Sequence, residues 1–201
     1  MRGFNPMHIL ISEIELWKQF RRGDKEAFAL LYESYFKRLY NYGRKFTADT
    51  EVIKDCIQDL FTKLWKNKNT LGETTCVKNY LFCSFRRILI EKINQHKKDI
   101  SGENIYDSYT FEISFPYESL LIAYQADAER KEEFARAIRA LSSRQREAIF
   151  LKFYEGISYE EVASIMSINT KSLYKLIAKA IHTLRENVKK TYFFLSFLLL
   201  S

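Results

Sequence analysis

The residues best suited to contact a nucleic acid lie near the C-terminal end of the chain, just after a short turn. The turn 167–169 separates a helical pattern over 158–166 from a second one that begins at Thr170. Ala163 supplies the small side chain that the first helix needs where the second helix crosses it closely. This pattern is typical of a helix-turn-helix, in which the N-terminal turns of the second helix enter the major groove of DNA.

Outside its apolar face, the second helix carries mostly basic and hydroxyl-bearing side chains. Lysine can bind phosphates, and serine and threonine can reach phosphates or base edges. A plain helical hairpin with a solvated basic face would show the same pattern, but the spacing favours DNA binding. The residues outside the apolar face are Thr170, Lys171, Ser172, Lys175, Leu176 and Lys179.

A second basic group lies on a helical pattern that runs from about 76 to 96. Tyr80, Arg86 and Arg87 are its candidate DNA-binding residues. Cations can follow a phosphate backbone while aromatic rings stack on unpaired bases. The pattern alone, however, favours the alternative that Tyr80 and Phe85 are mainly core residues and the arginines are ordinary surface.

Acidic residues and bulky aromatic residues lie together on the helical pattern that precedes this one. Asp55, Gln58 and Asp59 share one side of the helix, and Phe61 and Trp65 are close by. An aromatic residue beside charged ones resembles a protein–protein hot spot, although Trp65 fits a core position equally well.

No catalytic or metal-binding motif accompanies these residues. The three cysteines show no CxxC spacing, and the three histidines lie too far apart to form an HExxH-like pair. The GxxxxGK[ST], GxGxxG and GxSxG motifs are also missing from the sequence. We therefore expect a protein of a reducing compartment that is not an enzyme and uses no metal or cofactor.

Helical periodicity dominates the 201 residues, which include only six glycines and two prolines. So few turn-forming residues argue against a sandwich or barrel, and the predicted fold class is all-α. Capping side chains mark the helix starts: Ser12 with Glu15, Asp24, Asp49, Ser142 with Gln145, Ser158 with Glu161, and Asn169. Among the apolar residues assigned to the core-facing sides are Phe46, Val52 and Ile181.

The charge distribution divides the chain. Lys and Arg number 32 against 25 Asp and Glu, a net charge of +7 that favours a polyanionic partner. The stretch 99–129 holds seven acids and no Lys or Arg, which indicates an acidic linker between two more basic halves. No secretory signal is present, and the apolar run 192–200 is about half the length that crosses a bilayer. We therefore expect a cytoplasmic protein.

Both halves resemble one protein family. Region two of bacterial sigma factors is similar to DCIQDLFTKLW (Asp55 to Trp65) followed by KNYLFCSFRRILIEKI (Lys78 to Ile93), and region four is similar to Leu141 to Arg185. Two such regions with a short linker look like the extracytoplasmic-function (ECF) subgroup of the sigma-70 family. KSLYKLIAKAIHTLR resembles the versions from Bacteroidetes. The implied parts are an N-terminal extension (1–23), a region-two domain (24–96), the acidic linker (97–129), a region-four helix-turn-helix domain (130–190) and a hydrophobic tail (191–201).

The resemblance implies partners and roles. A sigma factor of this kind binds the β′ and β subunits of core RNA polymerase and promoter DNA, and is expected to have an anti-sigma factor. The residues that would meet the β′ clamp helices are Asp55, Gln58, Asp59 and Phe61. The loop 71–77 and the helix with Tyr80, Arg86 and Arg87 would take the minus-ten element, where the family melts DNA and holds an extruded base. The minus-thirty-five element would be read by the residues outside the apolar face of the last helix, Thr170, Lys171, Ser172, Lys175, Leu176 and Lys179.

Three positions depart from the family pattern. Arg87 lies where many relatives have Asn, Glu91 where they have Asp, and Leu176 where many have Arg. Two other hypotheses fit parts of the sequence: a helix-turn-helix regulator that binds DNA alone as a dimer, and a membrane-associated interaction protein whose tail is the functional part. The DCIQDLF motif favours the sigma factor over the regulator, because a regulator that binds DNA alone has no use for it.

Overall fold

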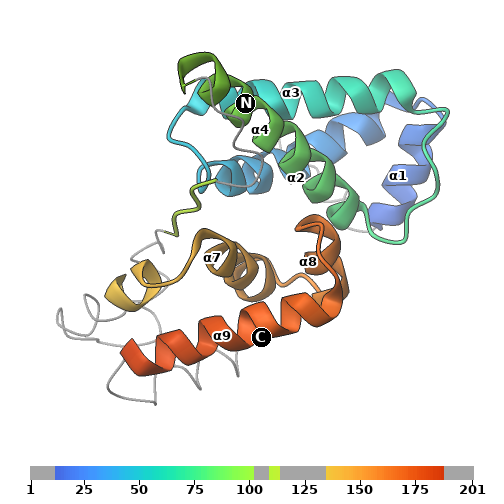
Figure 1. Ribbon diagram of the computed structural model, residues 1–201. Coiled ribbons are helices and arrows are strands. Elements are labelled where there is room, and N and C mark those ends of the chain that lie inside the picture. Colours follow the sequence, from blue (N-terminus) through green and yellow to red (C-terminus); the bar gives the residue numbers. More distant parts are fainter. Residues whose placement is uncertain (1–11, 102–108, 114–134, 188–201) are drawn as a thin grey trace, which may run out of the picture. The chain divides into compact units, whose positions relative to one another are not determined.

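The computed structural model describes residues 12–101, 109–113 and 135–187 (Figure 1). Helices account for the regular structure of these residues, so the predicted all-α fold is confirmed. The chain divides into two compact units. Unit 1 comprises Met1–Arg44 and Asp49–Tyr106, and unit 2 comprises Lys45–Ala48 and Asp107–Ser201. The tail and most of the acidic linker lie outside the described residues.

Among its described residues, unit 1 contains four helices, whose starts follow the local sequence. They are α1 (Glu13–Arg21), α2 (Lys25–Gly43), α3 (Thr50–Asn67) and α4 (Val77–Ser101). The Ser12, Asp24 and Asp49 side chains each accept a hydrogen bond from a backbone N–H in the first turn, as predicted from their capping chemistry. Gly23, with φ +93°, adopts the left-handed backbone that separates α1 from α2.

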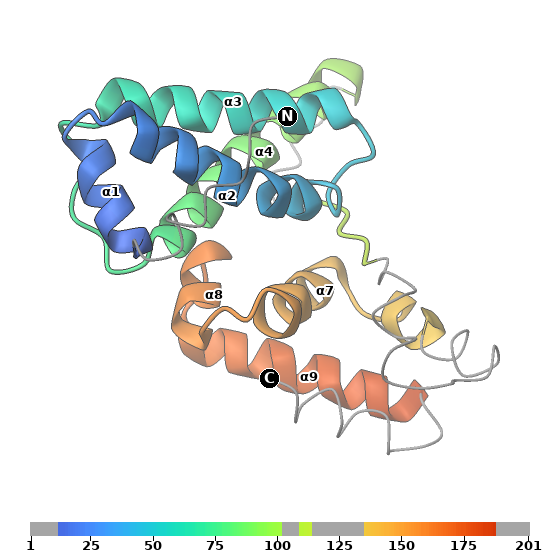
Figure 2. The ribbon, with the colours of Figure 1, turned by 180° about the vertical axis from the view of Figure 1, so that it is seen from behind.

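The core of unit 1 is rich in aromatic side chains. Helices α2, α3 and α4 pack against one another, and α1 contacts both α2 and α4 (Figures 1 and 2). Trp17 and Phe20 of α1 are 1% and 0% exposed. The hydroxyl of Tyr35 donates to Glu13 Oε2 at 2.7 Å. Helix α1 therefore belongs to the same compact unit as α2 to α4, although the sequence analysis assigned residues 1–23 to an extension.

Helix α2 ends earlier than the apolar pattern predicted. At Gly43, a Cβ atom would lie 2.8 Å from Ile53 Cγ2 and 3.1 Å from Phe85 Cζ, so α3 and α4 leave no room for a side chain. The helix stops there, and the prediction that Phe46 continues its apolar face is wrong. Phe46 belongs to unit 2, where its ring lies 5.0 Å from that of Phe111.

Unit 2 is built from short helices that precede one long helix. After a helical segment at 135–139 come α7 (Ser143–Ile149), the π-helical turn η2 (Phe150–Tyr154), α8 (Tyr159–Ile165) and α9 (Thr170–Asn187). Both capping boxes predicted in unit 2 are formed, Ser142 with Gln145 and Ser158 with Glu161. Helix α9 packs against α7 and α8 (Figure 2). No helix among the described residues is both long and apolar enough to span a membrane.

Candidate nucleic-acid interface

The turn between α8 and α9 has the geometry that the sequence predicted. Ser167 takes a left-handed backbone with φ 54°, which ends α8 and redirects the chain. The N–H of Ile168 donates to the carbonyl oxygen of Ala163 at 3.0 Å and closes the turn. Asn169 Oδ1 then accepts from the Ser172 N–H at 2.7 Å and caps α9. Local hydrogen bonds thus define the start of the candidate recognition helix.

One face of α9 is buried and the other carries the candidate DNA-binding residues. The buried residues are Leu173, Ile177, Ala180 and Leu184. Ile181, which the sequence analysis assigned to this face, is only half-buried, because Ala180 takes the core position. Lys171, Ser172, Lys175 and Lys179 are exposed, and Thr170 and Leu176 are half-buried. Four of the predicted contacts therefore share one solvent-facing surface.

An aromatic pair beside these lysines was missed by the sequence analysis. The rings of Tyr159 and Tyr174 stack with their centroids 4.6 Å apart, and Tyr174 is 51% exposed. Lys152 Nζ lies 4.7 Å from the Tyr159 ring centroid. Burial and the neighbouring Tyr174 raise the pKa of Tyr159, so its hydroxyl stays a hydrogen-bond donor near neutral pH. Tyrosine hydroxyls can donate to phosphates, but a pair 15 positions apart leaves no local sequence signal.

Helix α4 carries both buried core residues and exposed basic residues. Leu81, Phe82 and Phe85 are buried core residues. Tyr80 and Arg86 are half-buried, whereas the Arg87 side chain is 80% exposed, with Nε 3.8 Å from Glu91 Oε1. Helix α4 therefore inserts its aromatic side into the core and leaves Arg87 able to reach a partner.

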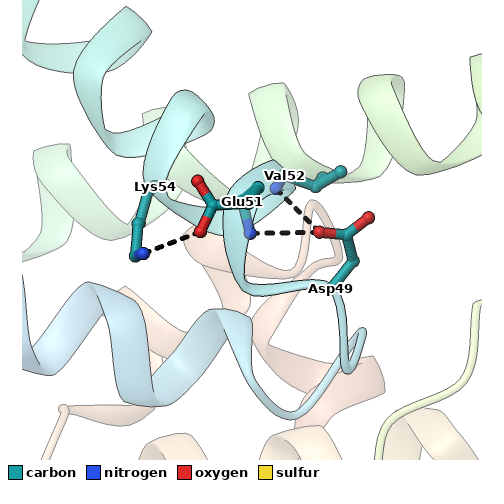
Figure 3. Close-up of polar contacts among 4 residues, drawn as sticks. All are labelled: Asp49, Glu51, Val52 and Lys54. Atoms are coloured by element: carbon teal, nitrogen blue, oxygen red, sulfur yellow. Dashed lines mark hydrogen bonds and ion pairs between the residues drawn. The ribbon is translucent and has the colours of Figure 1, made fainter.

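The acidic residues lie on α3, whose first turn is fixed by its own side chains. Asp49 Oδ1 accepts from the N–H groups of Glu51 and Val52, and Lys54 Nζ donates to Glu51 Oε1 at 2.7 Å (Figure 3). Further along α3, Gln58 and Asp59 are exposed. These two side chains stay accessible to a partner protein.

Asp55 has a partner within unit 1. Lys92 Nζ of α4 donates to Asp55 Oδ2 at 3.2 Å. Burial lowers the pKa of Lys92, but its hydrogen bond to Asp55 and the nearby acidic groups outweigh that effect, and the pKa lies above its usual value. Lys92 therefore stays charged, and the pair links α3 to α4. Since the Asp55 side chain is still 58% exposed, it can also face a partner.

Phe61 does not share this exposed surface. Its side chain is 3% exposed and packs 5.9 Å from the Phe28 ring and 5.0 Å from the Tyr32 ring, measured between centroids. The prediction that Phe61 itself presents a contact to a partner does not fit this burial. Its apolar ring is part of the packing between α2 and α3, which supports the acidic surface from beneath.

Comparisons with known proteins agree with this arrangement. The family model for sigma-70, region 4, matches residues 131–184, which include α7, η2, α8 and most of α9. The ECF RNA polymerase sigma factor SigM of Bacillus subtilis is 24% identical over 164 residues, 81% of this chain and 93% of SigM. SigK of Mycobacterium ulcerans is 21% identical over 172 residues, 85% of this chain and 90% of SigK. Over more than four fifths of its length, this chain is therefore similar to ECF sigma factors.

Solved structures share the fold of this chain. CnrH in complex with the cytosolic domain of CnrY is 19% identical, with a TM-score of 0.57 over 86% of this chain and 94% of that one. The sigma factor RpoE in complex with the anti-sigma factor NepR, from Bartonella quintana, is 20% identical, with a TM-score of 0.55 over 83% and 97%. The narrower likeness of the chain to Bacteroidetes versions stays a prediction.

Proposed function

We propose that this chain is an ECF sigma factor, which binds core RNA polymerase and directs it to promoters. Unit 2 reads the minus-thirty-five element, and unit 1 takes the minus-ten element and contacts the polymerase. It has no catalysis of its own, because the polymerase supplies the chemistry. Its place of action is the cytoplasm, where bacterial polymerase and promoters meet. An anti-sigma factor is a further expected partner, since the similar sigma factor RpoE is solved in complex with the anti-sigma factor NepR.

The observation that carries this proposal is the exposed start of α9. Lys171, Ser172 and Lys175 lie on the surface of the first turns, directly after the Asn169 cap, within the segment that matches sigma-70 region four. A helix placed in this way presents phosphate-binding cations and small polar groups to the major groove.

The minus-ten element is assigned to α4 and to the loop that precedes it. Tyr80 has an aromatic ring at the edge of the core, and Arg86 and Arg87 follow on the same helix. Aromatic faces stack on unpaired bases and arginines hold the phosphate backbone, which is the chemistry that a melted strand needs. We assign the polymerase contact to Asp55, Gln58 and Asp59 on α3.

A free-standing regulator is the less favoured alternative. SigM and SigK match 81% and 85% of this chain, well beyond the helix-turn-helix. A regulator would need only the helix-turn-helix and a dimer contact, which leaves the acidic surface of α3 without a use. The tail hypothesis concerns residues outside the described part of the chain.

Charge reversal on α3 tests the proposal. Asp59→Lys is the better variant, because reversing Asp55 would also place a cation beside Lys92. Glu33→Lys is the matched control, since Glu33 is an exposed acid on α2. We expect Asp59→Lys to weaken co-purification with core polymerase by roughly tenfold or more, as for a charged interface contact, while Glu33→Lys binds like the wild type.

The same reconstitution shows whether the complex is functional. Core polymerase with the wild-type chain should start transcripts at a defined set of promoters in a genomic library, and core polymerase alone should not. A wild-type chain that neither co-purifies with core enzyme nor directs such starts would overturn the proposal. Tight, sequence-specific binding to duplex DNA without polymerase would favour the regulator instead.

A further inference from the structure

The loop between α3 and α4 is supported by α1. In both views this loop runs past α1 (Figures 1 and 2). Trp17 of α1 is 1% exposed, and its Nε1–H donates a hydrogen bond to the carbonyl oxygen of Gly72 at 3.3 Å. Residue 72 lies 55 positions from residue 17, in the middle of a loop without regular structure. Helix α1 therefore fixes the loop backbone at Gly72.

The same indole also contacts the aromatic residue assigned to the minus-ten element. The ring centroids of Trp17 and Tyr80 lie 5.2 Å apart, with an interplanar angle of 58°. Trp17 also packs on Phe20 of α1, with ring centroids 5.3 Å apart. Trp17 thus joins two parts of the proposed minus-ten site, the backbone of the loop through its N–H and the ring of Tyr80 through its π-system.

Other contacts near the loop do less to fix its middle. Leu71 N–H donates to the carbonyl oxygen of Asn67 at 3.1 Å, and Cys76 N–H donates to Thr74 Oγ1 at 3.2 Å, which hold the two ends locally. Arg21 of α1 approaches Glu73 at 3.9 Å, but the Glu73 side chain is 83% exposed, so water and salt screen this pair. A buried indole N–H can only donate, which makes the bond to Gly72 the stronger constraint.

We propose that Trp17 is a positioning residue for recognition of the minus-ten element. The inference rests on the proposed function, in which the loop and Tyr80 receive a base extruded from the duplex. A loop that is already held in one conformation does not have to become ordered when the base enters. The affinity for the extruded base then depends on its contacts with the site, which differ from base to base. Loss of the indole N–H frees the loop to take other conformations, and discrimination between bases falls.

The test compares the two tryptophans of the chain. Trp17→Phe removes the N–H and keeps an aromatic ring between Phe20 and Tyr80. Trp65→Phe is the matched control, because Trp65 packs on Phe28, with centroids 5.0 Å apart, and lies under Lys68, the residue that follows α3. Each chain is reconstituted with core RNA polymerase and transcribed on two promoter libraries, one randomised in the minus-ten element and one in the minus-thirty-five element.

For Trp17→Phe we expect the ratio between the best and worst minus-ten sequences to fall several-fold. Its minus-thirty-five preferences and its co-purification with core enzyme should match the wild type. Trp65→Phe should keep both preference profiles. The inference is overturned if Trp17→Phe retains its minus-ten preferences, or if all templates lose activity by one factor, which is the result of a merely structural role. A wild-type chain that directs no transcription would instead overturn the proposed function.

A second variant separates the hydrogen bond from the shape of the ring. In the Trp65→Phe background, Trp17 is the one remaining tryptophan of the chain. Biosynthetic replacement by 3-benzothienylalanine then changes only residue 17, and puts sulfur in place of the N–H within a ring of the same shape. We expect the same loss of minus-ten discrimination as in Trp17→Phe. Preferences equal to those of the Trp65→Phe chain would overturn the role of the N–H.

Discussion

Ser167 is the non-glycine residue with positive φ in the described part of the chain, at 54°. The Cβ atom of an L-residue is crowded in this region, at a cost of about 1–2 kcal/mol. The turn tolerates this cost because the chain must leave α8 and enter α9 within three residues. A single strained residue therefore sets the relation between the two helices of the DNA-binding motif.

Replacing this serine by glycine should stabilise unit 2. Ser167→Gly removes the crowding but adds chain entropy to the unfolded state, so we expect a gain of about 0.5–1 kcal/mol. Hydrogen exchange followed by mass spectrometry measures this gain in stability, because the amides of α8 and α9 should exchange more slowly in the variant. Ser164→Gly, the same chemical change inside α8, should instead cost about 0.5 kcal/mol. Faster exchange in Ser167→Gly would show that the turn needs the serine.

Residue-level features were predictable where the cause is local. Asp24, Ser142, Ser158 and Asn169 all cap helices as predicted, because each cap depends on side chains within three positions. The contact of Trp17 with Gly72 was not predictable, since 55 positions separate the two residues and only tertiary packing joins them.

At the scale of helices, the presence of a helix was easier to predict than where it ends or which of its faces is buried. Helix α2 ends at Gly43, and Phe46 packs in unit 2, which periodicity does not show. Helix α3 buries Ile53 and Ile57 while Val52 is half-buried. Its buried surface is wider than a single stripe, because α3 packs against both α2 and α4. The polymerase and DNA roles of the candidate residues stay predictions.

Helix α9 allows positioning and reading to be separated. Lys175 and Lys179 are both exposed and lie four positions apart, so they share a face at successive turns. Lys179→Ala should lower transcription from all cognate promoters by a similar factor, with a shallower salt dependence. The reason is that a lysine this far from the N-terminal end of α9 is expected to bind phosphate. Changes at Lys171, Ser172 or Lys175 should alter which minus-thirty-five sequences are used, at about 1–3 kcal/mol per mismatch.

Transcription of a promoter library with each α9 variant measures both effects. Glu186→Ala is a control on the same helix, because Glu186 is exposed near its C-terminal end. If Lys179→Ala changes sequence preference while the first-turn variants only scale activity, the orientation of α9 in the groove is wrong.

For the whole molecule, net charge and its division between two units decide how the free chain meets DNA. The chain carries +7 overall, and candidate DNA-binding residues lie on α4 in unit 1 and on α9 in unit 2. Charge can bring each surface to the phosphate backbone without selecting a sequence. Specific binding then requires both surfaces to act on one promoter, which is the task of the polymerase complex.

Without polymerase, the chain should therefore bind duplex DNA weakly and with a steep salt dependence. If about four lysines or arginines contact phosphates, the affinity for DNA should fall by about 100-fold between 50 and 200 mM salt. Fluorescence anisotropy with labelled promoter and scrambled duplexes of equal length measures the slope and the specificity. Nearly equal affinities for the two duplexes are expected. A large preference for the promoter at physiological salt would contradict this.

The position of α1 has a consequence for any fragment of this protein. A comparison limited to the region-two motifs suggests a cut at Asp24, which would discard Trp17 and Phe20. Their removal would uncover the rings of Phe28, Trp65 and Tyr80, against which they pack. A shortened chain would then carry a contiguous apolar patch on its surface, and such patches promote self-association. Aggregation of such a fragment during purification would reflect its missing first helix, not poor solubility of the family.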